Sequence, residues 1–115
     1  MEVRDPIHGS IAIAHYEEDI LEHAFFRRLR NIKQLGFSEY VFPGATHSRF
    51  LHSIGVMDVV TKVFDKLFKD EPKSAELNKL RQTVRLACLL HDIGHAPLSH
   101  TTEFVMPMVD DLKLP

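Results

Sequence analysis

Two apolar stripes at helical spacing constrain the fold of this chain more than any other feature. Side chains three and four residues apart lie on one face of an α-helix. The first stripe, over residues 48–68, consists of Val56, Val59, Val60, Val63, Phe64, Leu67 and Phe68. The second, over residues 75–92, consists of Leu77, Leu80, Val84, Ala87 and Cys88 and follows Ser74, a residue type that caps helix N-termini. The chain is therefore predicted to be mainly α-helical.

The rest of the chain predicts shorter elements around these two helices. Residues 4–15 carry turn-prone pairs and an apolar run, which indicate a short extended segment or hairpin. An apolar stripe predicts a helix over 17–35, and the residues from 36 to 47 have the glycines and proline of a loop. A further short helix is expected from Ser99 to about Met106, followed by a polar tail.

Composition narrows the class of protein. The chain has 115 residues, 44% of them apolar and 26% charged, which is ordinary for one globular domain. A net charge of −2 gives no strong nucleic-acid signal. Cys88 is the single cysteine and is read as a buried free thiol, which fits a reducing compartment. No apolar run approaches the roughly 20 residues that span a bilayer, so we expect a cytoplasmic protein without a membrane partner.

The second helix ends in two strong metal-binding side chains, His91 and Asp92. At about 100° per residue, His91 lies within about 40° of the apolar stripe of its helix, and His52 lies equally close to the stripe of the preceding helix. Both imidazoles are therefore predicted to point into the core. Two histidines and an aspartate suit one divalent cation, with Fe, Mn, Zn or Mg as candidates. For His52 alone, a hydrogen-bonded core histidine is the simpler alternative.

A family resemblance follows from longer segments. The segment from His91 to His100 resembles the HD motif of the HD-domain phosphohydrolases. Residues 5–9, 28–36 and 41–56 resemble further motifs of the dNTP triphosphohydrolase branch of that family, in the same order and with matching gaps. The resemblance covers about residues 4–105 and implies the N-terminal part of an HD-domain helical fold.

The resemblance implies roles for individual side chains. His52, His91 and Asp92 match the metal ligands, and a cation bound there would lower the pKa of a water for attack on phosphorus. Asp92, Arg49 and His95 are the residues expected to carry catalysis. Arg49 lies one helical turn before His52, where a guanidinium can fork onto a phosphate. The alternative for Arg49 is a solvated arginine at a helix start.

Five residues are expected to contact substrate. Gln34 and Leu35 match positions that contact the sugar and help to select deoxyribose. Arg49 and His95 match positions near the phosphates. His100 lies near the same helix end and is expected either to hydrogen-bond a ligand or to be exposed.

The implied activity is hydrolysis of a deoxynucleoside triphosphate to nucleoside and triphosphate. The family's fourth metal ligand, a downstream aspartate, and its downstream acid histidine have no counterpart here, since Asp110 and Asp111 follow the motif too closely. We therefore expect residues 1–115 to be a single partial HD domain, with a motif-bearing region at 4–105 and a tail at 106–115. The alternatives are an HD phosphohydrolase with another nucleotide substrate, and a non-catalytic fragment that binds metal, nucleotide or a partner chain.

A basic cluster precedes the first loop, formed by Arg27, Arg28, Arg30 and Lys33. The simplest interpretation is the solvated face of an amphipathic helix. The resemblance implies instead that this helix takes part in allosteric nucleotide binding and in contacts between subunits of a homo-oligomer, with Arg30 at a matching position.

Overall fold

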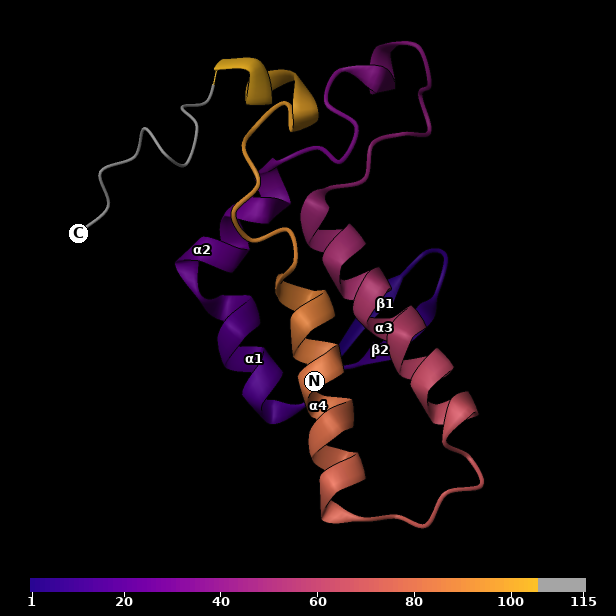
Figure 1. Ribbon diagram of the computed structural model, residues 1–115. Coiled ribbons are helices and arrows are strands. Elements are labelled where there is room, and N and C mark those ends of the chain that lie inside the picture. The colour runs from indigo at the N-terminus through magenta and orange to yellow at the C-terminus, as the bar shows by residue number, and fades with distance from the viewer. Residues whose placement is uncertain (106–115) are drawn as a thin grey trace, which may run out of the picture.

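The computed structural model describes residues 1–105 as a helical bundle with an N-terminal hairpin packed against it (Figure 1). The elements are β1 (Glu2–Asp5), β2 (Gly9–Ala12), α1 (His15–Glu22), α2 (Ala24–Arg27), the 3-10 helices η1 (Arg28–Asn31), η2 (Ser38–Tyr40) and η3 (Ser99–Val105), α3 (Arg49–Leu67) and α4 (Ala75–Leu90). The predicted tail at 106–115, with Met106, Asp110 and Asp111, lies outside the described residues. The prediction of a mainly α-helical fold with an N-terminal hairpin is confirmed.

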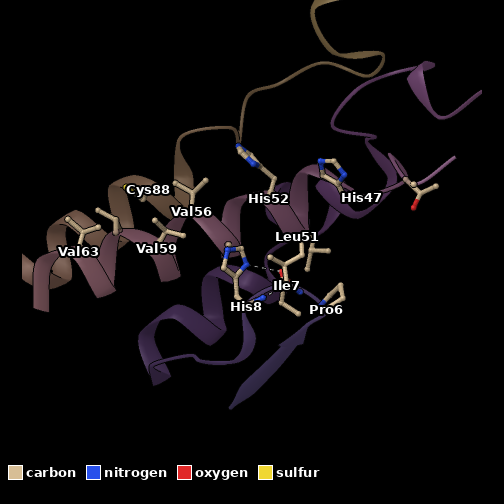
Figure 2. A pocket seen from close by; sticks show the side chains of 15 residues that line it. Pro6, Ile7, His8, His47, Leu51, His52, Val56, Val59, Val63 and Cys88 are labelled. Atoms are coloured by element: carbon tan, nitrogen blue, oxygen red, sulfur yellow. Dashed lines mark hydrogen bonds and ion pairs between the residues drawn. The ribbon is translucent and has the colours of Figure 1, made fainter. Parts of the chain in front are cut away.

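The hairpin is held by its turn. β1 and β2 are antiparallel, with Asp5 opposite Gly9. The Oδ1 atom of Asp5 accepts hydrogen bonds from the backbone N–H of Ile7 at 2.6 Å and of His8 at 3.1 Å. Gly9 has φ +77°, a left-handed conformation that glycine adopts without steric cost. This turn carries Ile7 and His8 toward α3 (Figure 2).

The prediction of a single helix over residues 17–35 is wrong. His23 is extended, with φ −65° and ψ 140°, and separates α1 from α2. Its Nδ1 accepts the backbone N–H of Phe25 at 3.4 Å, so the imidazole caps the second helix. The change of direction brings Phe26 and Leu29 into the core, where both are fully buried. Burial of these two side chains favours the break over a continuous helix.

The two long helices begin where the sequence predicts. Ser48 caps α3 by accepting the N–H of Leu51 at 3.3 Å, and Ser74 caps α4 by accepting the N–H of Leu77 at 3.0 Å. Figure 1 shows α3 and α4 as an antiparallel pair joined by a short loop at the end far from the 3-10 helices. No helix within residues 1–105 has the length and apolar character needed to cross a membrane.

The helix faces that pack into the core differ from those predicted. Val59, Val63 and Leu80 are 47–49% exposed, although each belongs to a predicted inward stripe. The core is instead formed by Ile11, Ile13, Leu21, Phe26, Leu29, Ile32, Phe50, Ile54, Met57 and Leu89. Both helices carry apolar side chains on more than one face. The spacing of these residues therefore does not determine which face packs into the core.

A buried ion pair ties α4 to the rest of the molecule. Arg85 donates to both carboxylate oxygens of Glu17 on α1 at 2.7 Å. It also donates to Oγ1 of Thr61 on α3 at 2.7 Å and to the carbonyl oxygen of Ala12 at 3.1 Å. These bonds satisfy both charges, as a buried pair requires. One arginine therefore fixes α4 against β2, α1 and α3 together.

Candidate metal centre

Three side chains from α3 and the end of α4 meet at one point. One ligand atom from each of His52, His91 and Asp92, called the triad below, lies within 4.8 Å of the others. Nε2 of His52 is 3.8 Å from Oδ2 of Asp92, and Nε2 of His91 is 3.4 Å from Oδ1. Among residues 1–105 this is the group of metal-binding side chains close enough to share an ion. The three side chains thus meet as the sequence predicts, and cation binding stays a prediction.

The prediction that both histidines point into the core is wrong. The side chains of His52 and His91 are 33% and 37% exposed. α3 packs through the face that bears Ile54 and Met57, and α4 packs through the face that bears Leu89. The histidines therefore lie at the rim of the helix pair. Such a rim leaves positions around a bound ion for water and substrate, which hydrolytic sites require.

The hydrogen bonds of the two imidazoles suit a metal ligand set. Nδ1 of His91 lies 2.7 Å from the carbonyl oxygen of Cys88. A carbonyl only accepts, so Nδ1 donates here and Nε2 is the ring nitrogen on the side of Asp92. Burial lowers the pKa of His52, with the attraction of Asp92 opposing this and nearby cationic groups adding to it. Two imidazoles and one carboxylate form a donor set for a divalent cation.

Arg49 contacts the carboxylate of this group. It is 2% exposed, and its Nη1 donates to Oδ2 of Asp92 at 2.7 Å. The alternative of a solvated arginine at the helix start is therefore wrong. As the first residue of α3, Arg49 is placed one turn before His52, so one helix supplies both an imidazole and a guanidinium to the same carboxylate.

The next two histidines are His95, in the loop after Asp92, and His100, in η3. The backbone N–H of His95 donates to the carbonyl oxygen of Asp92 at 3.0 Å, and this bond closes a turn over residues 92–95. His95 is half-buried, and its Nδ1 lies 3.1 Å from the carbonyl oxygen of Ala96. The rings of His95 and His100 meet edge to face with centroids 5.2 Å apart. His100 is exposed.

The predicted sugar-contacting residues lie on the loop before η2. Lys33 forms a β-bridge with Ser48, and the N–H of Gln34 donates to the carbonyl oxygen of His47 at 3.0 Å. Gln34 is thus held beside the chain segment that enters α3. Leu35 is 47% exposed, and no contact described for residues 1–105 joins it to the triad. The sugar-binding roles of both residues stay predictions.

A groove runs along the exposed apolar face of α3 (Figure 2). Its volume is about 720 Å³, and His52 is the triad member that lines it. The turn between the strands contributes Ile7 and His8, and α4 contributes Cys88, which is half-buried. The prediction of a buried thiol is therefore wrong. The role of His8 at this wall was missed because the sequence pattern offers no periodic partner for a turn residue.

Comparison with known proteins identifies the family. The family model described as HD domain matches residues 49–113, which include α3, α4 and the triad. The chain belongs to the HD-domain family. The motif resemblance of the sequence is thereby confirmed.

HD-domain relatives resemble the chain over most of its length. It is 41% identical over 101 residues to the deoxynucleoside triphosphate triphosphohydrolase SAMHD1 homolog of Dictyostelium discoideum, covering 88% of this chain and 20% of that protein. It is 42% identical over 98 residues to the deoxynucleoside triphosphate triphosphohydrolase SAMHD1 of Bos taurus, covering 85% of this chain and 17% of that protein. The chain therefore spans about a fifth of the length of these curated relatives.

A solved HD-domain neighbour supports the fold. The crystal structure of a phosphohydrolase from Bacteroides thetaiotaomicron superposes with a TM-score of 0.81 at 38% identity. The match covers 90% of this chain and 26% of that chain. Sequence and structure thus agree on an HD-domain phosphohydrolase fold.

Proposed function

We propose that this chain supplies the metal-binding part of a phosphohydrolase that converts deoxynucleoside triphosphates to nucleoside and intact triphosphate. The observation that carries the proposal is the meeting of His52, His91 and Asp92 at an exposed rim, with Arg49 beside the carboxylate. Relatives at 41–42% identity are named deoxynucleoside triphosphate triphosphohydrolases, which supports this substrate class. Residues 1–115 would then be one part of a larger HD domain, with its motifs at 4–105.

The three ligands have distinct tasks in this proposal. His91 and His52 present imidazole nitrogens, and Asp92 offers the charge that a dication needs. A bound divalent cation supplies Lewis acidity and lowers the pKa of a coordinated water. The hydrogen bond from His91 to Cys88 keeps the imidazole in one tautomer and orientation before any ion arrives.

Arg49 and His95 would act on the phosphates. Arg49 holds the Asp92 carboxylate and brings a positive charge to the same point, where charge builds on a phosphoryl group under attack. His95 is attached to Asp92 through its backbone and can donate to a phosphate oxygen or shuttle a proton. His100, in edge contact with His95, would extend this donor surface.

Gln34 and Leu35 would select the sugar. The backbone bond from Gln34 to His47 keeps this loop next to the segment that leads into α3 and its histidine. An amide and an apolar side chain side by side can accept a 3′-hydroxyl while leaving no hydrogen-bond partner for a 2′-hydroxyl. A buried hydroxyl without a partner is costly, so such a surface would favour deoxyribose.

The test is product analysis with defined metals. The chain is incubated with dGTP or dATP and Mn²⁺, Fe²⁺, Zn²⁺ or Mg²⁺ in turn, and the products are separated by anion exchange. The proposal expects nucleoside and intact triphosphate in equal amounts, with neither product formed by Asp92→Ala. Release of pyrophosphate or monophosphate would instead indicate a phosphohydrolase with another specificity.

Metal analysis separates the remaining alternative. A chain that takes up one equivalent of metal without turnover would be a binding fragment of an HD domain, which contradicts catalysis by this chain. A chain with no stoichiometric metal would contradict the ligand assignment itself. GTP, tested beside dGTP, measures the sugar preference expected from Gln34 and Leu35.

A further inference from the structure

Arg28 donates hydrogen bonds to the turn formed by residues 92–95, which follows His91 and is called the HD loop below. Its Nη2 donates to the carbonyl oxygen of Ile93 at 2.8 Å and to the carbonyl oxygen of His95 at 2.7 Å. These partners lie 65 and 67 residues away in the sequence. Both bonds are partly buried and involve a charged donor, which makes them stronger than ordinary backbone hydrogen bonds.

The two carbonyls belong to a turn whose backbone N–H groups already donate hydrogen bonds to other residues. The N–H of Ile93 donates to Leu90, and the N–H of His95 donates to Asp92. The N–H groups of the turn are thus bonded to nearby carbonyls, and Arg28 supplies hydrogen bonds to two carbonyl oxygens of the turn. Because the same turn begins at Asp92 and ends at His95, any displacement of it moves a triad carboxylate and the neighbouring imidazole together.

The neighbouring cations behave differently. Arg27 is exposed, whereas the guanidinium of Arg30 lies 3.7 Å from the ring centroid of Phe50. Lys33 donates to the carbonyl oxygen of Thr46. The basic cluster expected to form one solvated face is therefore divided, and Arg28 is the member directed at the HD loop.

We propose that Arg28 is a positioning residue that holds the turn from Asp92 to His95 in register with the triad. The expected effect on turnover rests on the proposed function. The expected effect on the position of the turn rests on the two hydrogen bonds alone. Arg28 acts through His95 and Asp92 rather than on substrate. A guanidinium suits this task because the N–H groups of its planar fork have fixed directions, whereas the three N–H groups of a lysine ammonium rotate on a flexible stem.

The experiment compares Arg28→Ala and Arg28→Lys with Arg27→Ala, a matched control that removes an adjacent exposed guanidinium. Hydrogen exchange at the backbone amides of Ile93 and His95 reports the turn directly. We expect Arg28→Ala to speed exchange there by about 10-fold or more while α3 stays protected. Arg28→Lys should give an intermediate rate, and Arg27→Ala should match the parent chain.

Turnover gives the second readout. Arg28→Ala should lower kcat for triphosphate release by about 10- to 100-fold, the range found when groups that orient a metal site are removed, with KM changed less than about threefold. Guanidinium ion at millimolar concentration should restore part of the rate, since it can occupy the vacated position. Arg28→Lys should retain more activity than Arg28→Ala.

The outcomes separate this inference from the proposed function. If the parent chain releases no triphosphate, the d–d spectrum of the Co²⁺-loaded protein replaces kcat, and a changed spectrum in Arg28→Ala still supports positioning. Equal exchange rates and equal spectra in Arg28→Ala and Arg27→Ala would overturn it. Loss of folding in Arg28→Ala, combined with a fully active Arg28→Lys that exchanges like the parent, would also overturn it.

Discussion

Arg49 donates to Asp92 across 2.7 Å, so a buried guanidinium at the start of α3 holds the acidic residue that follows α4. The same carboxylate lies 3.4 Å from His91 and 3.8 Å from His52. Asp92 is therefore balanced by a fixed cation and faces two imidazoles that can share a dication with it. We therefore expect stability and metal binding to be coupled through this one side chain.

Replacement of Arg49 should be partly compensated by metal. Arg49→Ala leaves the largely buried Asp92 carboxylate without its cation, which should cost about 3 kcal/mol of unfolding free energy in a metal-free buffer. Saturating Mn²⁺ or Zn²⁺ neutralises the same carboxylate and stabilises the folded state by mass action. Urea unfolding should thus show a smaller loss with metal than with chelator, and equal losses would contradict the coupling.

Removal of the triad carboxylate should abolish tight metal uptake. Asp92→Asn keeps the shape of the side chain but loses its charge, so affinity for Zn²⁺ or Mn²⁺ should fall by at least about 100-fold. Asp65→Asn is the control, because it removes a carboxylate from α3 that pairs with Arg81 at the surface. Isothermal titration and elemental analysis measure both variants. Retained stoichiometric metal in Asp92→Asn would refute its assignment as a ligand.

The buried pair of Glu17 and Arg85 predicts acid sensitivity. Burial raises the pKa of Glu17, but hydrogen bonds from Arg85 and from the N–H of Ala14 outweigh it, and the pKa lies below its usual value. A carboxyl with a lowered folded pKa contributes stability that is present above its unfolded pKa of about 4.3. This contribution is lost as pH falls from about 4.3 through the folded pKa.

Urea unfolding at a series of pH values tests this linkage. Glu17→Gln should lose about 3–5 kcal/mol near neutral pH, since it leaves the Arg85 charge buried without its partner. Its stability should then fall less steeply than that of the parent below about pH 4.3. Glu18→Gln removes an exposed neighbouring carboxylate and should leave the contribution of Glu17 intact. Parallel pH profiles for Glu17→Gln and the parent would contradict the prediction.

Gly55 and His8 should show energetic coupling. A Cβ added at Gly55 would lie 3.0 Å from Cε1 and 3.3 Å from Nδ1 of His8, so the imidazole must give way by a few tenths of an ångström. Alanine in a helix interior is favoured over glycine by about 1 kcal/mol. We expect Gly55→Ala to show little net gain alone, and to stabilise by about 1 kcal/mol in a His8→Ala background. Additive effects in this double-mutant cycle would show that the two residues do not interact.

The sequence alone determined the helical class, the hairpin and the starts of the two long helices. Ser48 and Ser74 cap α3 and α4 as local chemistry requires, and the turn-prone pairs Asp5-Pro6 and His8-Gly9 lie at the turn of the hairpin. The candidate ligands could also be predicted from the sequence, because His91 and Asp92 are adjacent and His52 lies on the neighbouring helix. Each of these inferences depends on residues close in sequence or on one regular helix.

Only the tertiary structure decided which faces are covered. The pattern predicts His52 and His91 in the core, yet they lie at a half-exposed rim, because Ile54 and Met57 of α3 and Leu89 of α4 are the residues buried there. The same long-range packing directs Arg28 to the HD loop. Burial depends on contacts between residues far apart in the chain, and helical periodicity contains no information on which of two apolar faces another element will cover.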